Sequence, residues 1–384
     1  MIGLYDRSSV DQVPWPATPD GDYARRVLDP LVRHGPQRYI DNVDAEVFVL
    51  VAGESVLPVV VAAPRPSIRN AYVCSPTTHY IDYARREVEL ELAERRALRT
   101  VVPPLLDALR PLLRWSRFEQ VVYVNNWLLS TNLYPALDPA TIRQIRDELI
   151  RRFPRHVIIF RSVDERLNAP LLRDLLGLQF RPVFSRQVYI LDPQAQERSY
   201  RKRKDFRSDV LLAGRTDYEW LSHDQLDPAT SARLAELYAE LYLHKYSFDN
   251  PQFNARFVAE ALDRRWLTIW ALRRNGHIDG VLGYVERHGV MTAPLLGYDR
   301  SVPQSAGLYR LLSLKLVEEA EQYGLVLHLS SGAAAFKRHR GGQPAIEYNL
   351  VYDRHCARRR RLPWQILEIL THRAIVPVMQ RFKL

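Results

Sequence analysis

The chain has 384 residues, of which 47% are hydrophobic and 26% are charged, and its formal net charge is +10. This composition is typical of a globular protein, and the length predicts two lobes of roughly 150 to 200 residues each. No apolar run approaches the roughly 20 residues that cross a bilayer, and the first residues lack the layout of an export signal. We therefore expect no stable membrane insertion and a cytoplasmic location.

The positive charge favours attraction to polyanions, such as nucleic acid, a phosphorylated cofactor or an anionic membrane surface. An arginine-rich genome would produce the same excess without functional meaning, and both interpretations stay open. The two cysteines, Cys74 and Cys356, lie far apart and have no metal-ligand spacing around them. The sequence therefore predicts neither a disulfide framework nor a metal site.

The first half of the chain alternates between strand and helix signals. A Pro- and Asp-rich arm over residues 1–35 ends in a short helix. Short β-branched or apolar runs predict strands at residues 46–51, 56–62, 71–74, 120–125, 157–160 and 188–191. Apolar residues at three-to-four spacing predict helices at residues 80–103, 105–113, 139–153 and 169–176. Asp138 is the expected cap of the helix at 139–153.

The second half follows a basic connector at residues 201–204 and repeats the order of elements. Helices are predicted at residues 228–243, 252–264 and 306–323, the last ending at Gly324. Strands are predicted at residues 267–273, 280–287, 290–298, 325–329 and 347–352. The domains expected from this order are an arm (1–35), a first lobe (36–195), a second lobe (196–355) and a basic amphipathic C-terminal helix (356–384).

Several segments of the second half resemble the second domain of Fem-type transferases, a branch of the GNAT acyltransferase superfamily. The segments are Tyr189 to Asp192, Gly297 to Asp299, Leu308-Tyr309, His328 to Gly332, Phe336-Lys337 and Glu347-Tyr348. The resemblance covers most of residues 187–360, whereas in the first half it depends on element order and on residues 171–191. It implies an α/β (α+β) fold of two tandem GNAT-like lobes, each a mixed, mostly antiparallel sheet flanked by helices.

The resemblance also implies a place for an acyl-CoA donor. In GNAT folds a strand-to-helix turn offers backbone N–H groups to the pyrophosphate, because a helix start carries unpaired donors and a positive dipole end. Here the turn is the cofactor-binding candidate Gln304, Ser305, Ala306, Gly307 and Leu308. The next residue is Tyr309, where the family has a small residue, and a plain helix start explains the same pattern.

Acyl transfer to an amine needs a base for the proton of the nucleophile and donors for the oxyanion. Glu286 on a central strand is a candidate base, and Tyr298 and Tyr309 are candidate proton donors. Lys337 matches a lysine that contacts the anionic end of the donor in Fem-type enzymes, which an ammonium suits. The plain alternatives are a solvated strand-edge carboxylate, packed aromatic rings and an exposed loop lysine.

Polar residues in both halves are candidates for the acceptor site. His328 and Ser330 alternate on one strand, and a polar cluster follows the helix ending near residue 243. Two first-half loops, at residues 74–80 and 125–132, are rich in hydrogen-bonding groups. The substrate-binding candidates are Cys74, Thr78, His79, Asn126, Tyr246, Asn250, His328 and Ser330. A packing histidine or a helix ending before a proline would explain parts of this set equally well.

Two basic segments add partner hypotheses. Residues 199–207 mix cations with aromatic rings, as an RNA-contacting surface does, although a solvated linker has the same composition. Arg358 to Arg361 precede an amphipathic helix that either touches a membrane or, as we prefer, packs across the lobes.

Together these features predict an N-acyltransferase that moves an acyl group from acyl-CoA or an acyl carrier protein to the amine of a small or peptide-like acceptor. One alternative is a Fem-type enzyme that uses aminoacyl-tRNA as donor. The other is a non-catalytic nucleic-acid-binding protein on the same scaffold.

Overall fold

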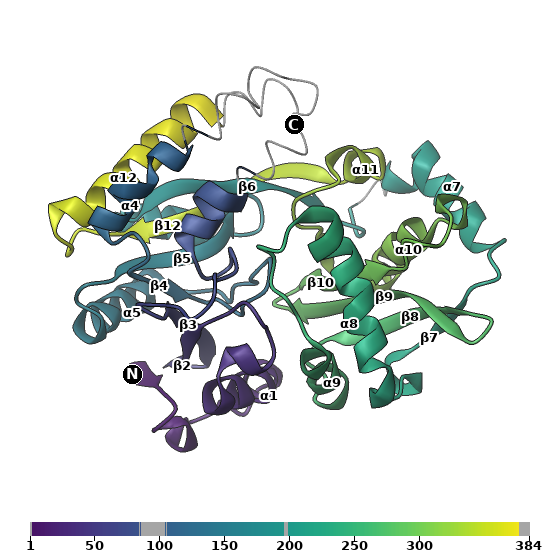
Figure 1. The fold of residues 1–384 in the computed structure, drawn as a ribbon, viewed down its shortest axis with the longest axis horizontal. Helices are drawn as coiled ribbons and strands as arrows, with labels where there is room; N and C mark the ends of the chain where they lie inside the picture. The colour runs from purple at the N-terminus through teal and green to yellow at the C-terminus, as the bar shows by residue number, and fades with distance from the viewer. Residues whose placement is uncertain (1, 84, 86–103, 105, 196–198, 376–384) are drawn as a thin grey trace.

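The computed structural model describes residues 2–83, 85, 104, 106–195 and 199–375. Within these residues, twelve strands form one sheet in the order β1-β2-β3-β4-β5-β12-β6-β11-β10-β9-β8-β7 (Figure 1). Two pairs of neighbours in this part of the chain, β4–β5 and β10–β11, are parallel, and the others are antiparallel. The strands are β1 (Ile2–Tyr5), β2 (Ala45–Ala52), β3 (Ser55–Ala62), β4 (Val121–Val124), β5 (Val157–Asp164), β6 (Arg181–Leu191), β7 (Glu219–Leu221), β8 (Thr268–Arg274), β9 (His277–Arg287), β10 (Val290–Tyr298), β11 (Val326–His328) and β12 (Gln343–Tyr352).

Helices pack on both faces of this sheet because successive strand residues alternate between the faces. On β9, Val281 and Val285 join a core on one face, whereas Leu282 and Tyr284 join a core on the other. The first face carries α1, α4, α8, α9 and α12, and the second carries α5 and α6 in the first half and α7 and α10 in the second. The helices are α1 (Pro19–His34), α4 (Arg110–Ser116), α5 (Pro139–Arg152), α6 (Ala169–Gly177), α7 (Lys204–Ala213), α8 (Ser231–Ala239), α9 (Ala255–Asp263), α10 (Leu308–Tyr323), α11 (Ala334–His339) and α12 (Arg358–Leu370).

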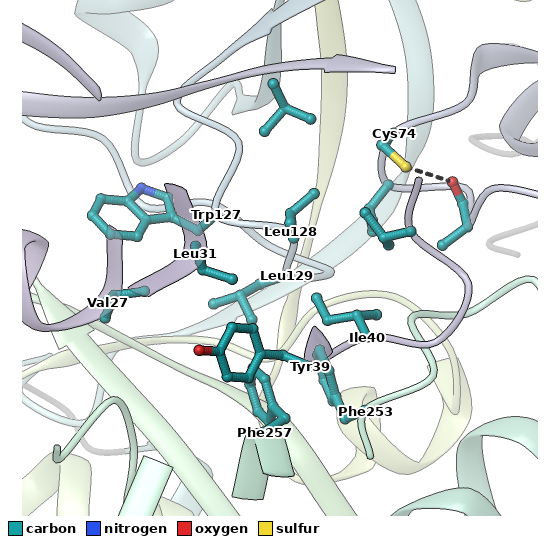
Figure 2. Packing of buried hydrophobic residues seen from close by; sticks show 14 of the residues in the cluster. Val27, Leu31, Tyr39, Ile40, Cys74, Trp127, Leu128, Leu129, Phe253 and Phe257 are labelled. Carbon is teal, nitrogen blue, oxygen red and sulfur yellow. Dashed lines mark hydrogen bonds between the residues drawn. The ribbon is translucent and has the colours of Figure 1, made fainter. Parts of the chain in front are cut away.

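The two halves share one apolar core. Figure 2 shows Tyr39 and Ile40 of the first half packed beside Phe253 and Phe257 of the second, with the Phe253 and Phe257 rings stacked 4.1 Å apart. The backbone of Ile40 forms an isolated bridge with Phe253. Burial of these large side chains against each other favours one closed unit over two independent ones.

Each half repeats one order of elements, and the halves exchange their last strands. The first runs β2-β3-α4-β4-α5-β5-α6-β6, and the second runs β8-β9-β10-α10-β11-α11-β12, so the orders agree except for α4. Strand β6 pairs with β11 of the second half, and β12 pairs with β5 of the first. The predicted fold class, a mixed and mostly antiparallel α/β arrangement flanked by helices, is confirmed, and the exchange joins the sheets of both halves into one.

Local signals placed several boundaries correctly. The Asp138 side chain accepts a hydrogen bond from the backbone N–H of Thr141 at the start of α5, as a helix cap does. Gly324 ends α10 with a left-handed φ of 68°, a conformation that glycine adopts without strain.

Other local predictions differ from the structure in kind or in length, or lie partly outside the described residues. Residues 71–74 form a turn rather than a strand, because the N–H of Cys74 donates back to the carbonyl of Ala71. The basic connector leads into helix α7, and the predicted strand 325–329 has only three residues. Residues 86–103 of the predicted helix 80–103 lie outside the described residues, as do the last nine residues of the expected C-terminal helix. Residues 1–35 contain strand β1 and the 16-residue helix α1.

One glycine fixes how closely α8 approaches the sheet. A Cβ atom added to Gly297 on β10 would lie 2.2 Å from the carbonyl oxygen of Leu237 and 2.5 Å from the backbone nitrogen of Tyr238. Because those atoms belong to a helix backbone, a side-chain rotation cannot relieve the overlap.

We expect Gly297→Ala to lower the free energy of unfolding by at least about 2 kcal/mol, measured by urea denaturation. The matched control is Gly177→Ala at the end of α6, where an added Cβ meets no atom within 4 Å. That variant should keep or slightly raise the stability, by up to about 1 kcal/mol. Equal stability of the two variants would contradict the close packing of α8 on β10.

Candidate functional site

A cavity of about 130 Å³ opens where β10 and β11 diverge. The two strands pair only from Val290 and Val326 to Thr292 and His328, and the register of β10 with β9 shifts directly after Thr292. Beyond that point, Ala293 and Leu296 of β10 line one side, and the residues that follow β11 line the other. We call this space the splay cavity.

Both halves of the chain contribute to the splay cavity. Helix α10 provides one wall, and α11 and the turn before it provide another. Tyr72, Tyr83, Ser130 and Arg186 reach the cavity from the first half. The site therefore depends on the strand exchange that joins the halves.

Lys337 on α11 is a buried lysine in this cavity, with 9% of its surface exposed. Its ammonium donates to the carbonyl oxygens of Ser331, at 2.6 Å, and Ser330, at 3.3 Å. Burial, together with the charge of Arg186, lowers the pKa of Lys337 to about 7, although the two carbonyl contacts favour the charged form. A lysine in this state can exchange a proton near neutral pH.

A buried ion pair supports the floor of the cavity. Arg186 on β6 donates to both carboxylate oxygens of Glu347 on β12, at 2.9 and 3.0 Å, and these residues lie opposite each other in the sheet. The same guanidinium donates to the Ser330 hydroxyl and to the Ser130 carbonyl. Burial acts to raise the pKa of Glu347, but the attraction and hydrogen bonds of Arg186 outweigh it and leave the pKa below its usual value.

His328 presents an N–H group for which the described residues provide no hydrogen-bond acceptor. Its Nδ1 accepts from the backbone N–H of Ser330, so the proton of the neutral ring is on Nε2. That Nε2 is buried and lies 3.9 Å from Glu347, too far for a hydrogen bond. Burial lowers the pKa of His328 to about 4, so the ring is a neutral donor at pH 7.

Aromatic rings form much of the remaining lining. Tyr242 stacks on Tyr238 with ring centroids 4.9 Å apart, and the Tyr309 ring lies 4.7 Å from that of Phe336. Burial raises the pKa of Tyr309 above its usual value. Its hydroxyl therefore stays protonated near neutral pH and can donate a hydrogen bond.

The structure brings six of the predicted site residues together in the splay cavity, and they come from α10, α11, β11, the turn after β11 and the segment between α8 and α9. They are Tyr246, Asn250, Tyr309, His328, Ser330 and Lys337. Tyr298 ends β10 with its ring 6.2 Å from that of Tyr309. Glu286 is exposed on β9.

The predicted cofactor turn, Gln304 to Leu308, lies beside the cavity rather than in its lining. Gln304 and Ser305 are exposed, and residues 304–306 form a short 3₁₀ turn before α10. Gly307 faces Leu212 of α7, because an added Cβ would lie within 2.4 Å of that side chain. The start of α10 is thus open at residues 304–305 and covered by α7 at residue 307.

The four candidates from the first half lie outside the cavity lining. Burial raises the pKa of the Cys74 thiol, which contacts the Ala71 carbonyl (Figure 2). Thr78 and His79 are buried in a short π-helix, and burial lowers the pKa of His79 to about 3. The Asn126 side chain binds the Val73 carbonyl. These contacts are those of structural residues.

Sequence reasoning missed several lining residues, above all Arg186 and Asp209. Asp209 on α7 is buried and binds Arg310 of α10 and Arg340 beside α11. Arg186 gave little signal, because Ser185 and Gln187 flank it in β6. Glu347 gave a clearer one, because it follows Ala345 and Ile346 in β12, and a charge in a buried strand needs a partner. Neither strand alone identifies that partner.

The described residues contain no cluster of three His, Cys, Asp or Glu side chains suited to a metal ion. Among the helices in the same part of the chain, none has the length and apolar character needed to cross a membrane.

Comparisons with known proteins show a similarity that lies mainly in the second half of the chain. The description "Acetyltransferase (GNAT) domain" matches residues 197–338. A search of curated proteins gave no match. Among solved structures, FemX is similar at 9% identity and a TM-score of 0.47, covering 65% of this chain and 83% of its own.

Two further solved structures are similar. A tandem GNAT protein from the clavulanic acid biosynthesis pathway has 11% identity and a TM-score of 0.40, covering 92% of this chain and 98% of its own. L-PGS from Bacillus licheniformis has 14% identity and a TM-score of 0.44, covering 60% and 76%. The matched segment, residues 197–338, spans α7 to α11 and includes β10 and β11 on either side of the splay cavity, so the similarity to a GNAT acetyltransferase domain falls on the part of the chain that forms much of this cavity.

Proposed function

We propose that the chain is an N-acyltransferase whose reaction takes place in the splay cavity, with an acyl thioester as donor and the amine of a small or peptide-like molecule as acceptor. The observation that carries this proposal is a buried lysine with a pKa of about 7 at the divergence of two parallel strands. An amine that attacks a thioester must lose a proton, and the leaving thiolate must gain one. A group that titrates near neutral pH serves both transfers.

The other lining residues have complementary roles in this proposal. The protonated hydroxyl of Tyr309 and the N–H of His328 are donors for the oxyanion that forms at the carbonyl. The apolar side chains Ala293, Leu296 and Phe336 exclude water from the acyl group. Because a thioester is already reactive, much of the rate enhancement comes from holding the two reactants in position.

A second candidate donor is an aminoacyl-tRNA. The observation that favours it is Leu212, which covers Gly307 at the start of α10, where a CoA pyrophosphate would approach the backbone. Arg203, Lys204 and Arg207 lie exposed at the start of α7, which packs against α10. These cations suit a nucleic-acid backbone.

Thermal unfolding in the presence of each donor separates the two candidates. A donor at 100 times its dissociation constant should stabilise the fold by about 2.7 kcal/mol, which is a rise of several degrees in Tm. We expect acetyl-CoA or a longer acyl-CoA to raise Tm, and charged tRNA at matched ionic strength to leave it unchanged. The reverse result would favour the second candidate, and no shift with either would remove both.

The variant Ser305→Asp tests whether the turn before α10 holds the donor phosphates. An added carboxylate near a helix start favours the helix itself but repels a bound pyrophosphate. We expect stability to be kept and acyl-CoA affinity to fall about tenfold, equivalent to about 1.4 kcal/mol. Unchanged affinity would mean that the phosphates bind elsewhere.

A further inference from the structure

Arg360 on α12 is a buried arginine that has no anionic partner in the part of the chain that the structure describes. It is 6% exposed, and its Nη1 atom is buried with no hydrogen-bond partner. No hydrogen bond or ion pair of its side chain occurs within the described residues. Because a guanidinium keeps its charge in proteins, leaving it desolvated and unpaired costs free energy unless an anion neutralises it.

The charged groups around Arg360 are also cations. Burial lowers the pKa of Arg360, and although Cys356 opposes this, the charges of Arg117, Arg359 and Arg155 lower it further. These three side chains are exposed and take part in no ion pair in the described part of the chain. The charges of three arginines thus act on Arg360. They come from the residue after α4, the turn before β5 and the first turn of α12.

The nearby carboxylate of Asp353 faces two other arginines. Asp353, 2% exposed, lies 3.5 Å from Arg181 and 3.9 Å from Arg361. Both contacts use Oδ1, and Oδ2 is buried without a hydrogen-bond partner among the described residues. Asp353 therefore lies beside two other cations and forms no ion pair with Arg360 in this part of the chain.

The start of α12 adds unpaired backbone donors to this cluster. The helix has 13 residues, and its N-cap residue, Ala357, cannot cap it with a side chain. Its first turn contains no acidic residue, although an acidic side chain is what the positive end of the helix dipole favours. The Nδ1 atom of His156 is also buried without a hydrogen-bond partner among the described residues. Burial, and then the charge of Arg360, lower the pKa of this histidine.

Open space adjoins the cluster. A cavity of about 460 Å³ is lined by Arg117 together with Arg65, Arg110 and Arg114. Arg110 is paired with Asp82 and Asp107, whereas Arg65 and Arg114 are exposed and form no ion pair among the described residues. The one acidic residue of the lining, Glu119, accepts hydrogen bonds from Ser75 and Thr77. An anion can therefore approach Arg117 through an opening in which arginines outnumber acidic residues.

We propose that the start of α12, with Arg117, Arg155, Arg359 and Arg360, is a binding site for a phosphate group. Arginine presents paired N–H donors that match phosphate oxygens, and a helix start supplies further N–H donors. The site lies beside α4, with which α12 packs (Figure 1), and shares no lining residue with the splay cavity.

Calorimetric titration of the whole protein with inorganic phosphate tests this site, with chloride at the same ionic strength as reference. We expect saturable binding to the wild type and at least about tenfold weaker binding to Arg360→Met, because truncation removes a buried charge-assisted contact. Arg117→Asn should also weaken binding. The position is exposed and has a left-handed φ of 55°, which asparagine tolerates, so folding should be unaffected. Arg173→Met, which removes an exposed arginine on α6, should bind as the wild type does.

Thermal unfolding provides the second readout. In chloride, Arg360→Met should be as stable as the wild type or more so, because the variant no longer buries an unpaired charge. Phosphate should raise Tm more in the wild type than in Arg360→Met. Phosphate also stabilises proteins in general, but that effect is common to both proteins and cancels when their two rises in Tm are compared. Equal phosphate binding by the wild type, Arg360→Met and Arg117→Asn, or no saturable binding at all, would overturn the proposal.

A third titration identifies the source of the phosphate group. Glycerol 3-phosphate that binds more tightly than inorganic phosphate would assign the site to a phosphate ester. Inorganic phosphate that binds as tightly or more tightly would assign it to the free anion. Both results support a phosphate site, and failure of both ligands to bind would refute it.

Discussion

Lys337→Met should lower acyl-transfer turnover by at least about 100-fold, the usual contribution of a positioned acid or base. The wild-type lysine lies in the splay cavity with a pKa of about 7, so near neutral pH it is present in both protonation states. Methionine fills a similar volume but exchanges no proton. The measurement is single-turnover transfer with the donor that thermal unfolding identifies.

Two further variants make this result specific. Lys337→Arg keeps the positive charge but removes the neutral form, and we expect it to stay at least about 100-fold below the wild type. Lys202→Met removes an exposed lysine before α7 and should leave turnover unchanged. Near wild-type activity of Lys337→Arg would show that the lysine acts as a fixed charge rather than as a proton carrier.

The stability of Lys337→Met should depend on pH in a defined direction. The pKa of Lys337 is lowered in the folded state, so between pH 7 and about 10.4, the pKa of a free lysine, the unfolded chain binds more protons than the folded one. Wild-type stability should therefore rise with pH in this window relative to Lys337→Met. A constant difference between the two proteins across the window would contradict the lowered pKa.

Features encoded in neighbouring residues were predictable from the sequence. The hairpin of β2 and β3, the Asp138 cap and the Gly324 stop each depend on a few adjacent residues. His328, Ser330 and Lys337 could likewise be grouped as site candidates, because they lie within ten residues of one another. Their grouping in one cavity follows from the short strand β11 and the turn into α11.

Features that depend on strand exchange were not predictable. Glu347 and Arg186 are 161 residues apart and meet only because β12 inserts between β5 and β6. Residues 71–74 are apolar and fully buried, so their pattern does not separate a strand from a buried turn. Helix α7 was missed because its first residues continue a run of charges that is equally common in linkers.

Glu347→Gln should lower the free energy of unfolding by about 3–5 kcal/mol, because it leaves the guanidinium of Arg186 buried and uncompensated. The Glu347 side chain is fully buried and that of Arg186 is 9% exposed. Urea denaturation measures the effect. The matched control is Glu148→Gln, which breaks a surface pair with Arg151 and should cost less than about 1 kcal/mol.

The cost of Glu347→Gln should shrink in acid. The folded-state pKa of Glu347 lies below that of a free glutamate, about 4.3, so its stabilisation is complete above that pH and is lost as the pH falls through the lowered value. The wild type and the variant should therefore converge in stability below about pH 4. A difference that persists unchanged to low pH would mean that shape, rather than charge, decides the effect.

The same pair links stability to the geometry of the proposed site. Arg186 also donates to the Ser330 hydroxyl and the Ser130 carbonyl, so it joins one residue from each half at the floor of the splay cavity. Replacing both partners with apolar residues, as in Arg186→Met/Glu347→Leu, removes the unpaired charge and should recover part of the stability. Turnover should not recover with it, because the two serines lose the guanidinium that holds them. Recovery of both would show that the ion pair stabilises the fold without positioning the site.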